Sequence, residues 1–378
     1  MSFIEYYESR HIIPTKIEWK EEIYQDLIVL EQSLVSIDGL FQLSTAFLQE
    51  AVKMIVNAIV LFEKGYYDSA YYSIRQSLEV AVSIVFFASK SEDQRNKILT
   101  KWKQKESNLM YARMLKEMGE KVTLVSDVII KMQHLIDETK TLKKKLDKEI
   151  HKEGLSTFYV VRNNVLNQFF KNENDNEEFK KIVIGSIKGL TLFRICLDPL
   201  PILLRDTKIY NRTPVFMTDS FPEYFINKYL TAYDIKKYQS TKIYEDAYIQ
   251  FIDNVEMNSS TVSFIKDSYV DYKCIDLILN QKDLLSDTQI AVLKILEKFR
   301  CVTKIYPDGQ MLEMYFTSLK STNPTWGFSE KNEFFDDILR NKEFLNVLSN
   351  NVYISSFFFK KRYFVIEHLK MIENKDLD

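Results

Sequence analysis

The chain has 378 residues, which is long for one domain, so we expect two domains or one domain with a large helical extension. Apolar residues make up 46%, enough for a substantial core, and the low content of Gly (8) and Pro (7) favours a mostly helical protein. Because 51 Lys and Arg are balanced by 53 Asp and Glu, the overall charge excludes binding of a polyanion through net charge, and any nucleic-acid contact has to come from a local patch.

The cysteines, histidines and apolar runs indicate a soluble, cytoplasmic protein. Cys196, Cys274 and Cys301 are widely separated and lack metal-binding or redox spacing, which is typical of reduced thiols. The N-terminus has acidic residues and no apolar run, so no signal peptide is predicted, and apolar stretches such as 80–88 are too short to cross a bilayer. With four histidines and no standard catalytic motif, we expect no metal, no cofactor and no membrane partner.

The first part of the chain is predicted to form long helices. Residues 1–15 are expected to be an extended arm, followed by helices over 18–37 and 40–63. The central element is a helix over 62–88, entered over Gly65. Its core stripe, at about 100° per residue, consists of Tyr67, Ala70, Ile74, Leu78, Ala81 and Val85.

Further helices follow before a boundary rich in proline. They are expected over 94–118, 122–153, 157–170 and 177–196. The charged centre of 122–153 is interpreted as a solvated face with i,i+4 ion pairs. Three prolines within 199–214 mark the boundary between two parts. We therefore expect an N-terminal domain over 1–205 and a C-terminal domain over 206–378.

The second part is predicted to be mostly helical with one hairpin. Helices are expected over 222–233 and 288–300, each preceded by a capping-box pattern. The run at 301–316, CVTKIYPDGQMLEMYF, alternates across a Pro-Asp-Gly turn and predicts a β-hairpin. Residues 322–372 are expected to form a loop and two or three helices. The predicted fold class is mainly α: an N-terminal antiparallel helical bundle and a second, mostly helical part containing one β-hairpin.

A charged pair stands out on the central helix. Arg75 lies between the residues that widen the apolar stripe, and Glu79 follows one turn later. A half-buried pair of this kind is costly unless it is hydrogen-bonded or used. The sequence favours an ion pair that latches the helix to a neighbour, and leaves open a functional site at these residues.

Basic residues in the C-terminal part suggest a weaker nucleic-acid site. The segment FFFKKRYF places Lys360, Lys361 and Arg362 among aromatic residues, an arrangement that can clamp nucleic acid. We favour the simpler interpretation, an edge of the core with cations that extend to solvent. A helix followed by the predicted hairpin also allows a DNA-binding regulator of winged-helix type that uses Lys304 and Lys320.

One run on the central helix resembles a known family. The sequence GYYDSAYYSIRQSLEVAVSI carries the pattern A-x-Y-x-x-R-x-x-L-E and resembles the helix of HEPN-type bacterial proteins over roughly 40–196. The resemblance implies a bundle of four or five helices, often encoded in toxin–antitoxin and phage-defence loci. It also implies metal-independent RNA cleavage at a dimer interface by an Arg-x4-6-His motif. In that chemistry Arg stabilises the developing phosphorane charge and His moves the 2′-hydroxyl proton.

The sequence departs from the family at its catalytic motif. No His follows Arg75 at the required distance, so catalysis would need His151, which ends a later helix, to meet Arg75, with Glu79 orienting one of them.

Two functions follow from the resemblance. We favour a catalytically degenerate HEPN-like protein of a defence or stress system that works through protein contacts or sensing, as a homodimer or with a partner protein. The alternative is an endoribonuclease toxin or antiviral effector with Arg75, Glu79 and His151 as its site.

Overall fold

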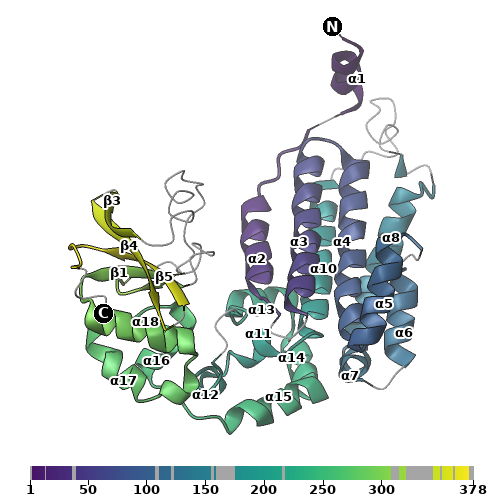
Figure 1. Cartoon of the computed structure of the whole chain (residues 1–378). Coiled ribbons are helices and arrows are strands. Elements are labelled where there is room, and N and C mark those ends of the chain that lie inside the picture. Colours follow the sequence, from purple (N-terminus) through teal and green to yellow (C-terminus); the bar gives the residue numbers. More distant parts are fainter. Residues whose placement is uncertain are drawn as a thin grey trace. The chain divides into compact units, whose positions relative to one another are not determined.

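The computed structural model is mainly helical, and the residues it describes also form a small antiparallel sheet of five strands (Figure 1). It describes residues 2–12, 14–35, 40–106, 110–120, 123–154, 157–158, 175–214, 218–307, 315–320, 344–349, 351–360 and 362–373. The chain divides into two compact units, Met1–Asp206 with Met217–Phe251, and Thr207–Phe216 with Ile252–Asp378. Residues 217–251 thus group with the N-terminal unit, whereas the sequence analysis places the division once, after residue 205.

The N-terminal unit is built from helices packed around α4. Its described helices are α1 (Phe3–His11), α2 (Lys20–Gln32), α3 (Phe41–Glu63), α4 (Tyr67–Ala88), α5 (Glu92–Lys103), α6 (Tyr111–Glu120), α7 (Leu124–Lys131), α8 (Gln133–Ile150), α10 (Asp175–Ile195), α11 (Leu200–Leu203), α13 (Glu223–Tyr229), α14 (Ala232–Gln239) and α15 (Lys242–Ile252). α3 and α4 run side by side, α2 packs on α3, and α10 packs on both α4 and α8. α4 therefore contacts α3, α8 and α10.

Side-chain size explains why these helices approach so closely. The predicted stripe of α4 is buried at Ala70, Ile74, Leu78, Ala81 and Val85. Gly65 takes a φ of 86° in the turn from α3 to α4, a conformation that side chains disfavour. On α10, a Cβ at Gly189 would lie 3.1 Å from Leu78 of α4 and 3.2 Å from Thr139 of α8. The glycine therefore permits contact with both neighbouring helices.

Helix α3 is the one described helix that is long and apolar enough to cross a membrane by length and composition. Its most apolar window has a mean hydropathy of 1.5. The sequence analysis thus underestimated the apolar length of this helix. In this structure α3 packs against α2 and α4, and its buried residues belong to the core of the N-terminal unit.

Several predicted helices differ in their limits. The expected arm at 1–15 is wrong, because Ser2 and Glu5 form a capping box that starts α1. The single helix expected over 94–118 is two helices, α5 and α6. The helix expected over 122–153 breaks at Met132 into α7 and α8. The helix expected over 222–233 also breaks, since α13 ends at Tyr229 and α14 has its own capping box. Nearly all of the helix expected over 157–170 lies outside the described residues.

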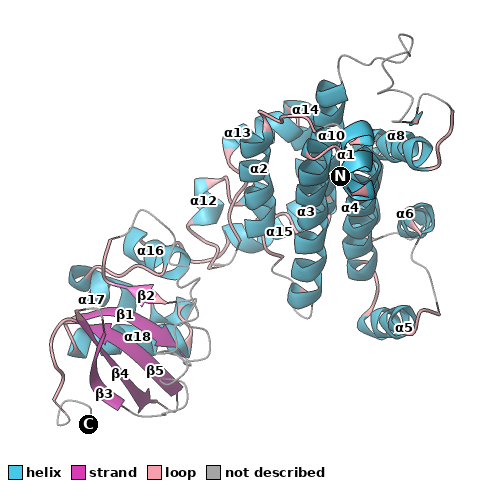
Figure 2. Ribbon diagram, turned by 90° about the horizontal axis from the view of Figure 1, so that it is seen from above, coloured by secondary structure: helices cyan, strands magenta, loops and turns pink. Residues whose placement is uncertain are grey.

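The C-terminal unit combines short helices with the sheet. Its described elements are α12 (Thr207–Tyr210), α16 (Ser259–Asp267), η2 (Tyr272–Cys274), α17 (Ile275–Leu279), η3 (Lys282–Leu284), α18 (Asp287–Lys298), β1 (Val302–Pro307), β2 (Phe316–Thr317), β3 (Phe344–Ser349), β4 (Val352–Phe359) and β5 (Arg362–His368). The strands are ordered β2-β1-β5-β4-β3, and every neighbouring pair is antiparallel. α18 lies against the sheet in both ribbon views (Figure 2).

The strands β3 to β5 correct the prediction of helices over 322–372. The predicted pairing of β1 with β2 is confirmed by Lys304 opposite Thr317, although the turn at 308–314 lies outside the described residues. β4 and β5 are rich in aromatic and β-branched residues, which pack well on a pleated surface. Phe364 and Ile366 share the core of α18, whereas Val365 faces the other side of the sheet. This alternation is typical of a strand with both faces covered.

Candidate functional site

A cluster of charged side chains joins α4 to α8. Arg75 of α4 lies 2.5 Å from Asp147 of α8 through its Nε, and 3.0 Å from Glu79 through its Nη2. Lys143 Nζ of α8 lies 3.0 Å from Asp147 and 3.5 Å from Glu79. We call Arg75, Glu79, Lys143 and Asp147 the charge cluster. Each of its charges faces two charges of opposite sign.

The electrostatics of the cluster favour the charged forms of Arg75 and Asp147. Burial alone would raise the pKa of Asp147, but hydrogen bonds from Arg75 and Lys143 outweigh it and lower that pKa. Burial likewise acts to lower the pKa of Arg75, and the hydrogen bond to Asp147 with the charge of Glu79 raises it instead. The exposed fraction of the four side chains runs only from 13% to 31%. Arg75 and Glu79 therefore form the expected ion pair, and the helix that they latch is α8.

A further ion pair extends this seam along both helices. Lys152, just after α8, pairs with Asp68 in the first turn of α4. The partners of successive α4 residues thus lie progressively earlier in the sequence of α8. This order is that of an antiparallel pair of helices joined by a row of opposite charges.

His151 lies beside the cluster and outside its bonds. It is the C-cap residue of α8, one turn beyond Asp147, and it is exposed. Within the part of the chain that the structure describes, its ring makes no hydrogen bond or ion pair with Arg75 or Glu79. The structure thus brings Arg75 and Glu79 together and gives Arg75 a carboxylate partner on α8. The catalytic arrangement with His151 stays a prediction.

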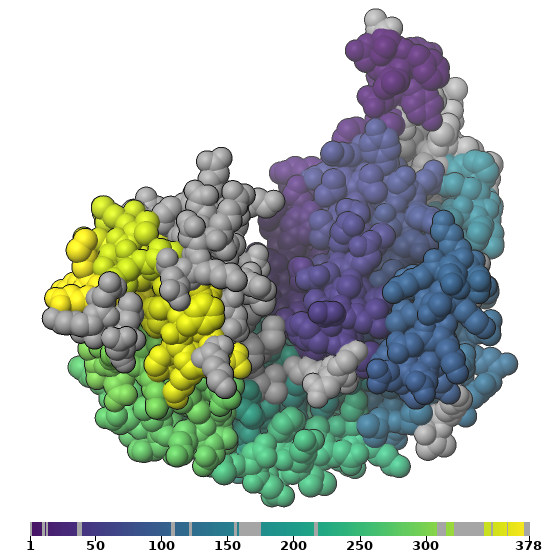
Figure 3. All heavy atoms as spheres, viewed as in Figure 1, coloured from purple at the N-terminus to yellow at the C-terminus, as the bar shows by residue number. Residues whose placement is uncertain are grey.

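A pocket of about 530 Å³ adjoins the charge cluster between α6, α7 and α8. It shares Lys143 and Asp147 with the cluster. Its floor is apolar and consists of Tyr111, Leu115, Ile129 and Ile136, all of which are buried in the core of the N-terminal unit. In the space-filling view, α5 and α6 form the blue surface of this unit (Figure 3). The pocket volume is within the range of sites for small molecules.

The rim of the pocket is rich in lysine. Its polar lining consists of Lys116, Gln133, Lys140, Lys143, Lys144 and Asp147. Tyr111 is 4% exposed, and its hydroxyl has no hydrogen-bond partner among the described residues. Burial raises the pKa of this phenol, so it stays a neutral donor. Buried polar groups are nearly always paired, so an unpaired hydroxyl beside a pocket is a feature that requires a reason.

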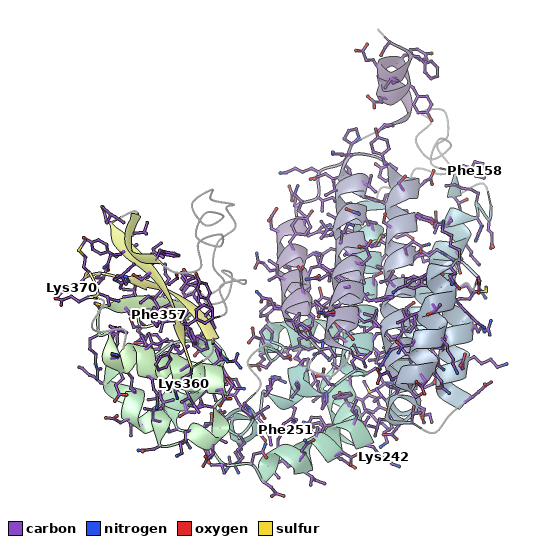
Figure 4. The ribbon with its side chains drawn as sticks, viewed as in Figure 1. Phe158, Lys242, Phe251, Phe357, Lys360 and Lys370 are labelled. Atoms are coloured by element: carbon purple, nitrogen blue, oxygen red, sulfur yellow. The ribbon has the colours of Figure 1, made fainter. Side chains whose placement is uncertain are left out.

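Lys360, in the turn between β4 and β5, belongs to the C-terminal unit (Figure 4). Lys360 and Arg362 are exposed, and Lys361 lies outside the described residues. Slight desolvation and the nearby ammonium of Lys294 on α18 lower the pKa of Lys360. The two lysines thus form a local positive patch, and the nucleic-acid site at this turn stays a prediction.

The hairpin lysines give little support to a DNA-binding surface. Lys304 Nζ is 3.0 Å from Glu367 of β5, and the side chains are 23% and 15% exposed. Its charge is therefore already neutralised within the sheet, whereas Lys320 is exposed.

Sequence reasoning missed the α8 half of the charge cluster. The charged centre of α8 resembles a fully solvated helix, yet Leu135, Ile136, Thr139 and Leu146 are buried. This narrow stripe was the available signal, because Lys143 and Asp147 lie on its shoulder one turn apart. The pairing itself depends on which helix packs on α4, and local sequence does not specify that.

Other buried polar groups serve the fold. Arg194 of α10, whose side chain is fully buried, binds Asp198 and the carbonyl oxygens of Ser33 and Leu34. On the sheet, the buried His368 accepts a hydrogen bond from Ser355 at Nε2 and donates one from Nδ1 to the carbonyl of Lys370. Both groups are buried and are bonded to residues of their own unit.

No group of three or more His, Cys, Asp and Glu side chains in the described parts of the chain is arranged to hold a metal ion.

Comparison with known proteins finds no matching family model, no matching curated protein and no matching solved structure. The resemblance to the HEPN family therefore rests on the residues of the α4 motif alone.

Proposed function

We propose that this chain is a catalytically degenerate HEPN-like protein of a bacterial defence or stress system, which works through protein contacts or ligand sensing. The observation that carries the proposal is the position of Arg75. Its guanidinium is held by Asp147 and Glu79, so the donors that would stabilise a phosphorane in the family are used to join α4 to α8.

The packing of the helices supports the fold that this proposal needs. The motif-bearing helix α4 contacts the long helices α3, α8 and α10, and α10 also contacts α3 and α8. Of the residues in the motif, Ala70 and Leu78 are buried in the core, and Arg75 lies at its edge. A bundle that keeps its core residues while its arginine forms an ion pair is the expected form of a member without activity.

An exposed helix supports action through protein contacts. α1 extends beyond the ends of α3 and α4 (Figure 1). It exposes the apolar side chains of Phe3 (79%) and Ile4 (66%) next to each other, and neighbouring apolar groups on a surface often mark a site of protein contact. We include a homodimer or a partner protein in the proposal for this reason.

Induced expression tests the proposal in cells. Wild type, Arg75→Ala and His151→Ala are expressed at equal levels, and growth and total RNA are compared. We expect all three cultures to grow alike with intact RNA. Growth arrest with fragmented RNA in the wild type, relieved by both substitutions in folded protein, would instead establish the endoribonuclease.

A further inference from the structure

We propose that the pocket between α6, α7 and α8 binds an organic anion, a small molecule with an apolar body and one acidic group such as a carboxylate or a phosphate monoester. This inference deepens the proposed sensing function and rests on it. It names the class of ligand and the residues that recognise it.

The apolar body fits the floor of the pocket. Tyr111 and Leu115 from α6, Ile129 from α7 and Ile136 from α8 present a continuous apolar surface that belongs to the main core. A pocket with an apolar floor and a few polar groups at its edge is the usual form of a small-molecule site. Burial of the ligand against this floor would supply most of the affinity, and the polar groups at the edge would select the chemical class of the ligand.

The charges at the edge favour an acidic group. Lys144 is exposed and has no ion pair among the described residues. Lys116 and Lys140 pair only with residues one turn away on their own helices, Glu120 at 3.7 Å and Asp137 at 3.3 Å. Such exposed pairs are weak and easily exchanged for a ligand.

The charge cluster limits where the anion can bind. Lys143 is shared between Glu79 and Asp147, so these two carboxylates repel an anion at the inner end of the pocket. The acidic group is therefore expected at the outer rim, beside Lys144 and Lys140.

The hydroxyl of Tyr111 supplies a second, independent indication of a ligand. It is buried, it belongs to a residue that lines the pocket, and it lacks a partner within the described chain. An acceptor atom on the ligand body would satisfy it. Tyr111→Phe should therefore weaken the binding of a ligand whose body carries an acceptor, without destabilising the fold.

Gly119 provides a way to close the pocket without disturbing the fold. It lines the pocket on α6, and a Cβ built there meets no atom within 4 Å. Substitution by a residue with a side chain also improves helix propensity. Gly119→Leu should thus occupy the space of the ligand, and Gly119→Ala is the matched control that leaves most of it open.

The probe is anilinonaphthalenesulfonate, an aromatic sulfonate whose fluorescence rises in an apolar site, titrated into the full-length protein. We expect saturable binding that Gly119→Leu abolishes and Gly119→Ala retains. We expect Lys144→Gln to weaken it by about threefold, the loss of an exposed charged partner. Tyr111→Phe should change the affinity for this probe little, because the apolar body of the probe has no acceptor atom. The uncharged analogue phenylnaphthylamine should bind more weakly than the sulfonate.

Three results would overturn the inference. Binding that persists in Gly119→Leu places the probe elsewhere, absent binding in the wild type removes the site, and equal binding of the uncharged analogue removes the preference for an anion. Each is separate from the proposed lack of catalysis. RNA that stays intact on expression while the probe fails to bind leaves the non-catalytic function standing and removes only the ligand.

Discussion

Replacing Arg75 tests whether the charge cluster holds the fold together. Arg75→Met keeps a side chain of similar length and removes the guanidinium, leaving Asp147 and Glu79 to share Lys143. Hydrogen bonds to charged groups contribute about 1.5–3 kcal/mol each, and fully exposed ion pairs about 0.2–1 kcal/mol. The Arg75 side chain is 20% exposed and binds two carboxylates, so its contribution should lie near that of a hydrogen bond to a charged group.

We expect Arg75→Met to lower the free energy of unfolding of the N-terminal unit by about 2–3 kcal/mol. A double-mutant cycle with Asp147→Asn should give a coupling energy of about 1–2 kcal/mol, because the two groups are in direct contact. Arg75→Lys should recover part of this stability, since lysine keeps the positive charge but has a single nitrogen in place of the guanidinium.

Urea unfolding followed by the fluorescence of Trp19 and Trp102 measures this loss, because both side chains belong to the N-terminal unit. A Trp326→Phe background removes the third tryptophan. The matched control is Lys53→Met, which breaks an exposed pair with Glu50 on α3 and should cost less than about 0.5 kcal/mol. If the Arg75 and Lys53 variants are equally stable, the cluster is not a latch and the reasoning fails.

Three further predictions concern groups that stabilise each unit. Arg194→Met should cost about 3–5 kcal/mol in urea unfolding, because it leaves Asp198 and two backbone carbonyls buried without their donor; a cost below 1 kcal/mol would contradict this. Burial lowers the pKa of His368, so its neutral form is favoured in the folded state. The contribution of His368 to stability is complete above the ordinary pKa of about 6.5 and falls as the pH drops below it. The melting temperature of His368→Gln should therefore depend less on pH than that of the wild type, and an equal dependence would show that another group causes it. Gly189→Leu should cost about 1–3 kcal/mol by overpacking against Leu78, and a melting temperature equal to wild type would show that the helices can separate.

Sequence patterns were sufficient for the helices with strong local signals. The α4 stripe of Ala70, Ile74 and Leu78 was predicted, and all three are buried. The capping box predicted before 288–300 is confirmed, since Ser286 caps α18, whereas the one predicted before 222–233 is wrong, because α13 starts after Pro222 without a side-chain cap. These features depend on residues within a few positions of one another, and the sequence contains that information directly.

Features that depend on distant partners were not predicted. The strands β4 and β5 were predicted as helices because VYISSFFF lacks a clear periodicity. Their identity depends on the sheet: β4 pairs with β3 and β5, and β5 pairs with β1, where Pro307 lies opposite Phe364. Asp147 lies 72 residues after Arg75, so their contact follows from helix packing and from no local motif. The site was thus predictable on α4 and unpredictable on α8.

Incubation of the purified chain with total RNA, with and without a metal chelator, tests the central claim most directly. Wild type, Arg75→Ala and His151→Ala are compared at equal concentration after confirmation that each is folded. The account predicts that the RNA stays intact in all three reactions, because Arg75 is bound within the charge cluster. Cleavage by the wild type that resists the chelator and is lost in both variants would contradict it.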